Sequence, residues 1–267
     1  MPYFNFTQEI GKPDFTSAAE GSRSSRVADI TGESSSSESF KSNYAKLPDY
    51  LKSCLDYSAI VCWRSYRVEI GKLVRLLLAE GLIEDRPGDI MEDVAENVLK
   101  ELIDLGMLQV QQVQQETEVK VPASYVQLCI LKLEKQDFVS KTANSPVRLR
   151  IRDDGRDIYP NVEGLLIQSL FIISERRDSS FGAPRGLSRA YMRNVCGMHF
   201  LLVLDLRGLI ECLPDELGDL IHLRYLGLFN SNLDELPGTL GNLKRLQTLD
   251  IRMCRHLRKL PIEILHI

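Results

Sequence analysis

The sequence lacks the patterns that mark secreted, membrane and metal-binding proteins. Its six cysteines are scattered and include no C-x-x-C pair, which disfavours a zinc site or a disulfide framework and fits a reducing compartment. No run of eighteen or more apolar residues occurs, so no membrane-spanning helix is expected, and the first residues contain no apolar signal segment. These absences predict a cytoplasmic protein without a structural metal.

Signs of catalysis are equally sparse. The four histidines all lie in the last third of the chain, and no Ser/His/Asp, Cys/His or paired-carboxylate arrangement is recognisable. The formal net charge of -4 gives no general attraction to nucleic acid or to anionic membranes. We therefore expect a protein that is not an enzyme and has no catalytic residues.

What the sequence does contain is a repeat near its C-terminus. Three L-x-x-L-x-[LI] segments begin at Leu201, Leu223 and Leu246, which are 22 and 23 residues apart, and each is followed by a Leu-Pro pair. This period is typical of a leucine-rich repeat solenoid, in which each coil contributes a short strand to a parallel sheet and must stack on its neighbours to bury its leucines. We predict a repeat domain over residues 146–267, with regular coils over 199–267.

Residues 146 to about 198 carry no such regular spacing. The segments 147–151 and 166–173 are apolar and β-branched, and they read as strands. We assign them to irregular first coils of the same solenoid.

Residues 42–140 alternate between helical and extended patterns. Apolar spacing predicts helices that begin near Pro48, from Val68 to Ala79 and from Asp89 to Leu105, and a last helix near 125–135. Asp89 and Glu92 fit a capping box for the third helix. Two strands, over 107–113 and 118–121, separate the third helix from the last. Three helices, a hairpin and a trailing helix describe a winged-helix domain.

The N-terminal segment differs from both domains in composition. Nine of the 21 positions from Ser22 to Ser42 are serine, and few apolar residues accompany them. Such a segment cannot bury enough surface to offset its ordering entropy, so residues 1–41 are predicted to be a disordered tail. The fold class is thus mixed α and β, with an α-rich winged-helix domain followed by the solenoid.

The strands of the regular coils predict a binding surface. Alternate side chains would form three columns on the concave face: Val203, Tyr225 and Thr248; Asp205, Gly227 and Asp250; and Arg207, Phe229 and Arg252. Aromatic residues and arginine are enriched in protein interfaces. We predict that these nine residues face outward and bind a protein partner, and the alternative is an ordinary solvated sheet face.

Three segments in the first half of the chain, together with the repeats, resemble a known family. Residues 43–54 (NYAKLPDYLKSC), 72–83 (KLVRLLLAEGLI) and 92–102 (EDVAENVLKEL) are similar to successive blocks of the winged-helix part of plant nucleotide-binding leucine-rich repeat (NLR) disease-resistance proteins. The Leu-Pro-x-x-Leu-Gly repeats are similar to the solenoid of the same proteins. The resemblance covers about residues 42–267 and implies a role in defence.

The chain departs from this family where nucleotide is bound. Full-length members bind ADP or ATP, but no G-x-x-x-x-G-K-[ST] phosphate loop occurs here, and Tyr125-Val126-Gln127 stands in place of the family's Met/Val-His-Asp motif. Val126 cannot hydrogen-bond a phosphate. The sequence therefore predicts a truncated or degenerate member that lacks the nucleotide switch and binds no cofactor.

The resulting hypothesis is a non-enzymatic protein-interaction module in innate immune signalling. Its expected partner is a pathogen effector, a guarded host protein or another immune receptor. One alternative is a receptor gene remnant without activity. The other is a winged-helix DNA-binding regulator, which is disfavoured because the candidate recognition helix holds five acids, at positions 92, 93, 96, 101 and 104, against Lys100 alone.

Overall fold

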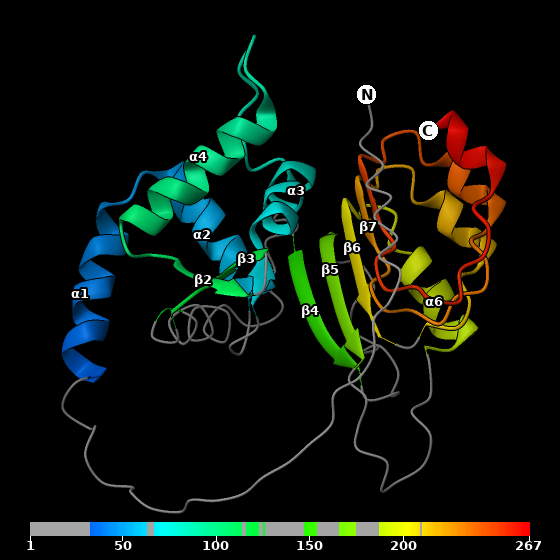
Figure 1. The fold of residues 1–267 in the computed structure, drawn as a ribbon, viewed down its shortest axis with the longest axis horizontal. Coiled ribbons are helices and arrows are strands. Elements are labelled where there is room, and N and C mark those ends of the chain that lie inside the picture. Colours follow the sequence, from blue (N-terminus) through cyan, green and yellow to red (C-terminus); the bar gives the residue numbers. More distant parts are fainter. Residues whose placement is uncertain are drawn as a thin grey trace, which may run out of the picture.

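The computed structural model describes residues 33–62, 67–113, 116–122, 125, 147–153, 166–174, 187–208 and 210–267. These residues form two bodies that lie side by side (Figure 1), a helical domain with a small sheet and a repeat domain built on a larger sheet. Among these residues, no helix has the length and apolar character needed to cross a membrane.

The first body has the predicted winged-helix elements. They are α1 (Glu33–Lys46), α2 (Asp49–Val61), β1 (Val68–Glu69), α3 (Ile70–Glu80), α4 (Met91–Asp104), β2 (Gln109–Val113) and β3 (Glu116–Lys120). The three strands form an antiparallel sheet in the order β1-β3-β2. Of the predicted last helix, only Tyr125 belongs to the described residues.

Helix α1 corrects the predicted start of the ordered chain. The sequence prediction ends the tail at residue 41, whereas α1 begins at Glu33, and residues 1–32 lie outside the described part. Phe40 gives the physical reason, because its side chain is buried and its ring lies 5.0 Å from that of Tyr125. The Tyr44 hydroxyl also donates to Asp56 of α2 at 3.0 Å. Aromatic packing against Tyr125 and the hydrogen bond to α2 thus extend the domain beyond the predicted boundary.

Two further local predictions are wrong. Residues 68–69 do not begin a helix, because Val68 pairs with Val119 of β3 and forms strand β1. The predicted capping box is also absent: α4 starts after Ile90 with no side-chain cap. The apolar residues of α4 belong to the buried core or pack against it, but Leu105, where the helix is predicted to end, is 48% exposed.

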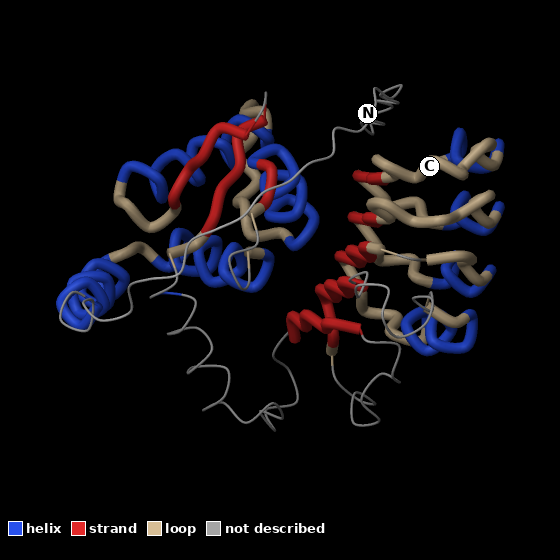
Figure 2. Tube along the Cα trace, turned by 60° about the horizontal axis from the view of Figure 1, so that its bottom comes forward, coloured by secondary structure: helices blue, strands red, loops and turns tan. Residues whose placement is uncertain are grey.

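The second body is a five-stranded parallel sheet. Its strands are β4 (Val147–Asp153), β5 (Ile167–Ser174), β6 (Val203–Arg207), β7 (Tyr225–Gly227) and β8 (Thr248–Asp250), in sequence order. The two strands predicted upstream of the regular repeats therefore join the repeat sheet. Helix α6 (Arg189–Cys196) and the short 3-10 helices η2 (Asp215–Asp219), η3 (Gly238–Asn242) and η4 (Ile262–His266) line the opposite side of the coils (Figure 2).

The leucine spacing explains why the coils stack. Leu204, Leu226 and Leu249 occupy the same register position in three adjacent strands and are nearly fully buried. The leucines of the Leu-Pro pairs and those that follow them close the same apolar cluster from the other side. Each coil thus buries its leucines against the next, as the repeat pattern predicts.

The turn after each regular strand needs one left-handed residue. Gly208, Asn230 and Met253 occupy this place, each two residues after the last inward leucine or isoleucine, with φ angles of 108°, 57° and 62°. Glycine and asparagine adopt this conformation readily, whereas an ordinary side chain crowds the backbone there at a cost of about 1–2 kcal/mol. Met253 is therefore strained, and its side chain is also 48% exposed.

We predict that Met253→Asn stabilises the protein by about 1 kcal/mol, because asparagine relieves this backbone strain without leaving a buried cavity. The measurement is urea unfolding followed by circular dichroism. The matched substitution Asn230→Met, at the equivalent turn of the preceding coil, should lower the free energy of unfolding by a similar amount. Equal stability of both variants and the unsubstituted chain would contradict this account of the turn.

Candidate protein-interaction surface

The concave face of the repeat sheet is in contact with the chain's own winged-helix domain. Helix α3 crosses the strands (Figure 1), with Glu80 at its end reaching Ser169 of β5 and Lys72 near its start reaching Asp205 of β6. Glu69, just before the helix, reaches Arg252 beyond β8. The 11 residues of α3 span about 16 Å, and three steps between neighbouring strands span about 14 Å. The helix length therefore matches the stack of strands.

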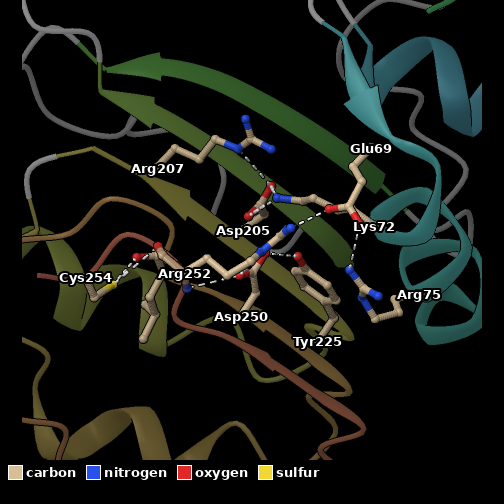
Figure 3. A network of polar contacts seen from close by, with 10 residues as sticks. Glu69, Lys72, Arg75, Asp205, Arg207, Tyr225, Asp250, Arg252 and Cys254 are labelled. Atoms are coloured by element: carbon tan, nitrogen blue, oxygen red, sulfur yellow. Dashed lines mark hydrogen bonds and ion pairs between the residues drawn. The ribbon is translucent and has the colours of Figure 1, made fainter. Parts of the chain in front are cut away.

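The central contact is a buried ion pair. The Lys72 ammonium donates to both carboxylate oxygens of Asp205, at 2.8 and 2.9 Å, and lies 5.7 Å from the centre of the Tyr225 ring (Figure 3). The two charged side chains are only 2% and 6% exposed. A buried charge is stable only with such a partner, so this pair fixes how α3 sits on the sheet.

Gly227 makes room for that ion pair. A Cβ atom at this position would lie 2.2 Å from an Asp205 carboxylate oxygen and 2.9 Å from the Tyr225 ring. Every residue type except glycine would displace the Asp205 carboxylate, which explains why glycine stands between two aspartates in the predicted column.

A second set of charges lies at the end of α3 nearest β8. Arg252 donates to both oxygens of Asp250, at 2.8 and 2.9 Å, and also bonds Glu69 (Figure 3). Burial disfavours the Asp250 carboxylate, but the hydrogen bonds from Arg252 and the positive charges of Lys72 and Arg252 outweigh it and lower the pKa of Asp250 to about 2. Asp250 and Arg252 are therefore both charged at neutral pH.

A third polar group lies at the other end of α3. The Glu80 carboxylate, 0% exposed, accepts hydrogen bonds from Arg148 of β4 at 2.6 Å and from Ser169. The Tyr57 hydroxyl lies 3.2 Å from the Ser169 hydroxyl. Burial raises the pKa of Tyr57 well above its usual value, so the phenol stays protonated.

Apolar side chains join the two domains between these polar groups. Phe171, Val203 and Tyr225 of the repeat sheet belong to the same buried cluster as the winged-helix core. The Tyr57 and Phe171 rings meet edge to face, with centroids 6.1 Å apart. The concave face thus carries an apolar patch that its own winged-helix domain covers.

The nine residues predicted to bind a partner are stacked as expected but are not open to solvent. The paired strands align Val203 with Tyr225 and Thr248, and Asp205 with Gly227 and Asp250, while Arg207 lies 5.3 Å from the Phe229 ring centre. Five of the nine are buried: Val203, Asp205, Tyr225, Gly227 and Asp250. Arg207, Phe229, Thr248 and Arg252 are half-buried. The expectation of an exposed face is wrong because α3 covers it, and binding of a partner there stays a prediction.

The residues of α3 that make these contacts were not predicted from the sequence. Apolar spacing places Leu73 and Leu77 in one stripe along this helix, and both are buried in the cluster of the winged-helix core. Lys72 and Leu76 form a second buried face. A leucine outside the first stripe is the signal that this helix is covered on two sides, and Lys72 precedes it by one helical turn.

Two of the buried cysteines, Cys54 and Cys196, offer no reactive thiol. Burial raises the pKa of Cys54 and that of Cys196 to about 12, so their thiolates are not populated near neutral pH. Within the ranges that the structure describes, no group of three or more His, Cys, Asp and Glu side chains is arranged to hold a metal ion.

Two family models match the chain in the order of its two bodies. The model of the disease resistance protein winged helix domain matches residues 64–127, and that of the leucine-rich repeat region matches residues 186–267. Both domain types predicted from the sequence are therefore confirmed.

Three similar proteins of Arabidopsis thaliana are named as disease resistance proteins. A disease resistance RPP13-like protein 3 is 29% identical over 221 residues, which are 79% of this chain and 26% of that protein. A disease resistance RPP13-like protein 2 is 28% identical, with coverages of 79% and 26%. A disease resistance RPP8-like protein 2 is 28% identical, with coverages of 78% and 24%. The chain thus spans about a quarter of the length of these relatives.

We predict that Lys72→Ala lowers the free energy of unfolding by about 3–5 kcal/mol, because it leaves the Asp205 carboxylate buried without its partner. Urea unfolding measures this. The double variant Lys72→Met with Asp205→Leu should recover most of the loss, since it removes both charges.

The exposed pair between Lys52 and Asp49, 3.3 Å apart, provides the control. Lys52→Ala should cost less than about 1 kcal/mol. If Lys72→Ala costs no more than Lys52→Ala, the winged-helix domain is not docked on the sheet through a buried pair.

Proposed function

We propose that this chain, a protein of the plant NLR disease-resistance type, acts as a non-enzymatic protein-interaction module in defence signalling in the cytoplasm. The proposal rests on the observation that helix α3 of the winged-helix domain covers the concave face of the repeat sheet. A face that pairs its charges with the chain's own α3 is a recognition surface, and its exposure is set by whether the winged-helix domain stays docked. This arrangement lets a binding event be transmitted from one domain to the other.

The contact has the composition of an interface that can open. Three polar groups join the domains, centred on Glu69 just before α3 and on Lys72 and Glu80 within it, and they accompany the apolar contacts of the shared cluster. Charged groups regain hydration when an interface separates, so ion pairs fix the register of the domains and lower the net cost of opening relative to a purely apolar interface. We therefore propose that the function depends on separation of the winged-helix domain from the repeat sheet at this contact.

The partner that we propose is a protein: a pathogen effector, a guarded host protein or another immune receptor. The half-buried rim residues Arg207, Phe229 and Arg252 support this choice, because arginine and aromatic side chains supply much of the binding energy of protein interfaces. A partner that binds at this rim would compete with Glu69 for Arg252.

Recognition of DNA by the winged-helix domain has less support. Helix α4, the candidate recognition helix, exposes Asp93, Glu96, Glu101 and Asp104, against one exposed lysine, Lys100. Such a surface repels the phosphate backbone.

We further propose that these 267 residues by themselves bind no nucleotide. Its sequence contains no phosphate loop, and Val126 takes the place of the family's histidine. Titration of the purified chain with ADP or ATP in a calorimeter should give only the heat of dilution, and saturable binding of either nucleotide would contradict this proposal.

The defence role is tested by opening the docked domain in leaf cells. Lys72→Glu places a carboxylate against Asp205 and should separate the domains, so transient expression of this variant should raise ion leakage and defence-gene transcripts above those of the unsubstituted chain. The compensating variant Lys72→Glu with Asp205→Lys restores an ion pair and should return the response to the original level. If all three proteins accumulate equally and none changes the response, the alternative of a receptor remnant without activity is correct.

A further inference from the structure

The loop of the last regular coil has the opposite charge to the loops of the two coils before it. In each coil this loop joins the strand to the following 3-10 helix. In the first two coils, over residues 208–214 and 230–237, its charged side chains are all acidic. In the third coil, over residues 253–261, it contains no acid, and its cations are Arg255, Arg258 and Lys259. We call residues 253–261 the basic loop, and its charge is particular to this coil.

The three cations of the basic loop are not used by the fold. Arg255, Arg258 and Lys259 are all exposed. Among the residues that the structure describes, none of the three takes part in an ion pair. Arg252, just before the loop, differs from them because it is half-buried and is held by Asp250. The loop therefore presents three positive charges to solvent without a partner of opposite sign.

The exposure of the basic loop does not depend on what stacks on the last coil. The second coil is covered by the third, yet Asn232, Asp234 and Glu235 are exposed at the corresponding places of its loop. A backbone bridge between Glu235 and Lys259 shows that the two loops lie side by side. A further coil would therefore leave the three cations of the basic loop exposed as well.

Two exposed apolar side chains flank these cations. Met253 at the start of the loop is 48% exposed, and Ile262 just after it is 72% exposed. At the corresponding places the second coil has Asn230 and Gly238, which are also exposed but are not apolar side chains. Met253 is kept there although its left-handed backbone is strained. The last coil thus combines unpaired cations with large apolar side chains at its surface.

This combination suits an anionic lipid surface better than a protein pocket or a nucleic acid. Specific protein interfaces and single-stranded nucleic acids are bound largely through aromatic side chains, and no Phe, Tyr or Trp occurs from residue 252 to 262. The phosphates of a DNA duplex would leave Met253 and Ile262 without a contact. Anionic headgroups attract lysine and arginine, and the boundary with the acyl chains accepts apolar side chains.

The distribution of charge over the molecule favours one orientation on such a surface. The net charge of -4 repels an anionic membrane from most of the protein. The acidic helix α4 and the last coil lie at opposite sides of the molecule (Figure 1). The basic loop can therefore approach the membrane while the acidic helix stays away from it.

We propose that the basic loop docks this protein on anionic membrane surfaces. Arg255, Arg258 and Lys259 contact the headgroups, and Met253 and Ile262 enter the boundary with the acyl chains. The docking is peripheral and reversible, because two apolar side chains and three cations are too few for a stable anchor. It leaves α3 in place on the concave face, so it goes beyond the proposed function and does not rest on it.

Vesicle flotation of the purified chain tests the headgroup contact. Vesicles of phosphatidylcholine with about one third phosphatidylserine should bind the protein, vesicles of phosphatidylcholine alone should not, and added salt should weaken the binding. The triple variant Arg255→Gln, Arg258→Gln and Lys259→Gln should lower the partition coefficient by about fivefold per cation, or about 100-fold in all.

A matched variant removes the same charge elsewhere. Lys41→Gln, Lys46→Gln and Lys100→Gln neutralise three exposed lysines of the winged-helix domain and should leave vesicle binding unchanged. Met253→Asn tests the apolar contact and should weaken vesicle binding by about fivefold. Because asparagine relieves the strained turn, this loss cannot be attributed to unfolding, and urea unfolding of each variant checks that point.

The proposal is overturned if both kinds of vesicle bind the protein equally, or if the two triple variants bind alike. A polyglutamate peptide and a DNA duplex are tested alongside the vesicles. If either binds through the three cations while vesicles do not, the loop serves an acidic protein or a nucleic acid and the lipid assignment is wrong. None of these readouts uses leaf cells, so the absence of a defence response would not affect the conclusion.

Discussion

A lysine and an aspartate that cannot be buried apart determine how the two domains meet. Lys72 and Asp205 are 2% and 6% exposed, and the loss of hydration would exceed any gain from packing if either lacked the other. Gly227 is required because the Asp205 carboxylate occupies the space of its side chain. Once this pair is in place, the matching lengths of α3 and the strand stack bring Glu69 to Arg252 and Glu80 to Ser169.

Helix α3 connects the domains because two of its faces are buried. Leu73 and Leu77 belong to the cluster of the winged-helix core, and Lys72, one helical turn before the buried Leu76, pairs with Asp205 of the repeat sheet. A change at the sheet therefore acts on a helix that is already part of the other domain's core. This shared element, rather than a flexible hinge, is the physical route by which the two domains influence each other.

The leucine periodicity predicted the repeating strands correctly, but it did not predict contacts between residues that are far apart in the sequence. The leucine spacing gave the strands and their columns correctly, because each coil copies the last. It placed the columns in solvent, because nothing in a single sequence pairs Lys72 with a carboxylate 133 residues later. The starts of β1 and α1 were also not predicted, because both depend on residues distant in the sequence. Val68 forms a strand because it pairs with Val119, and the helix around Phe40 is stabilised by packing against Tyr125. Leu76 was the one local sign of the hidden interface.

The repeat domain and its cover contribute differently to stability. The coils are held by leucines that lie on the side of the sheet away from α3 and form their own cluster, so the strands do not need the winged-helix domain to stay stacked. The cover adds only a narrow apolar patch, from Phe171 to Tyr225, flanked by charges that water solvates well. Separation therefore loses apolar burial but regains hydration of several ions, and these terms oppose each other. A contact balanced in this way can be shifted by a partner that supplies a few favourable interactions, whereas the leucine core cannot.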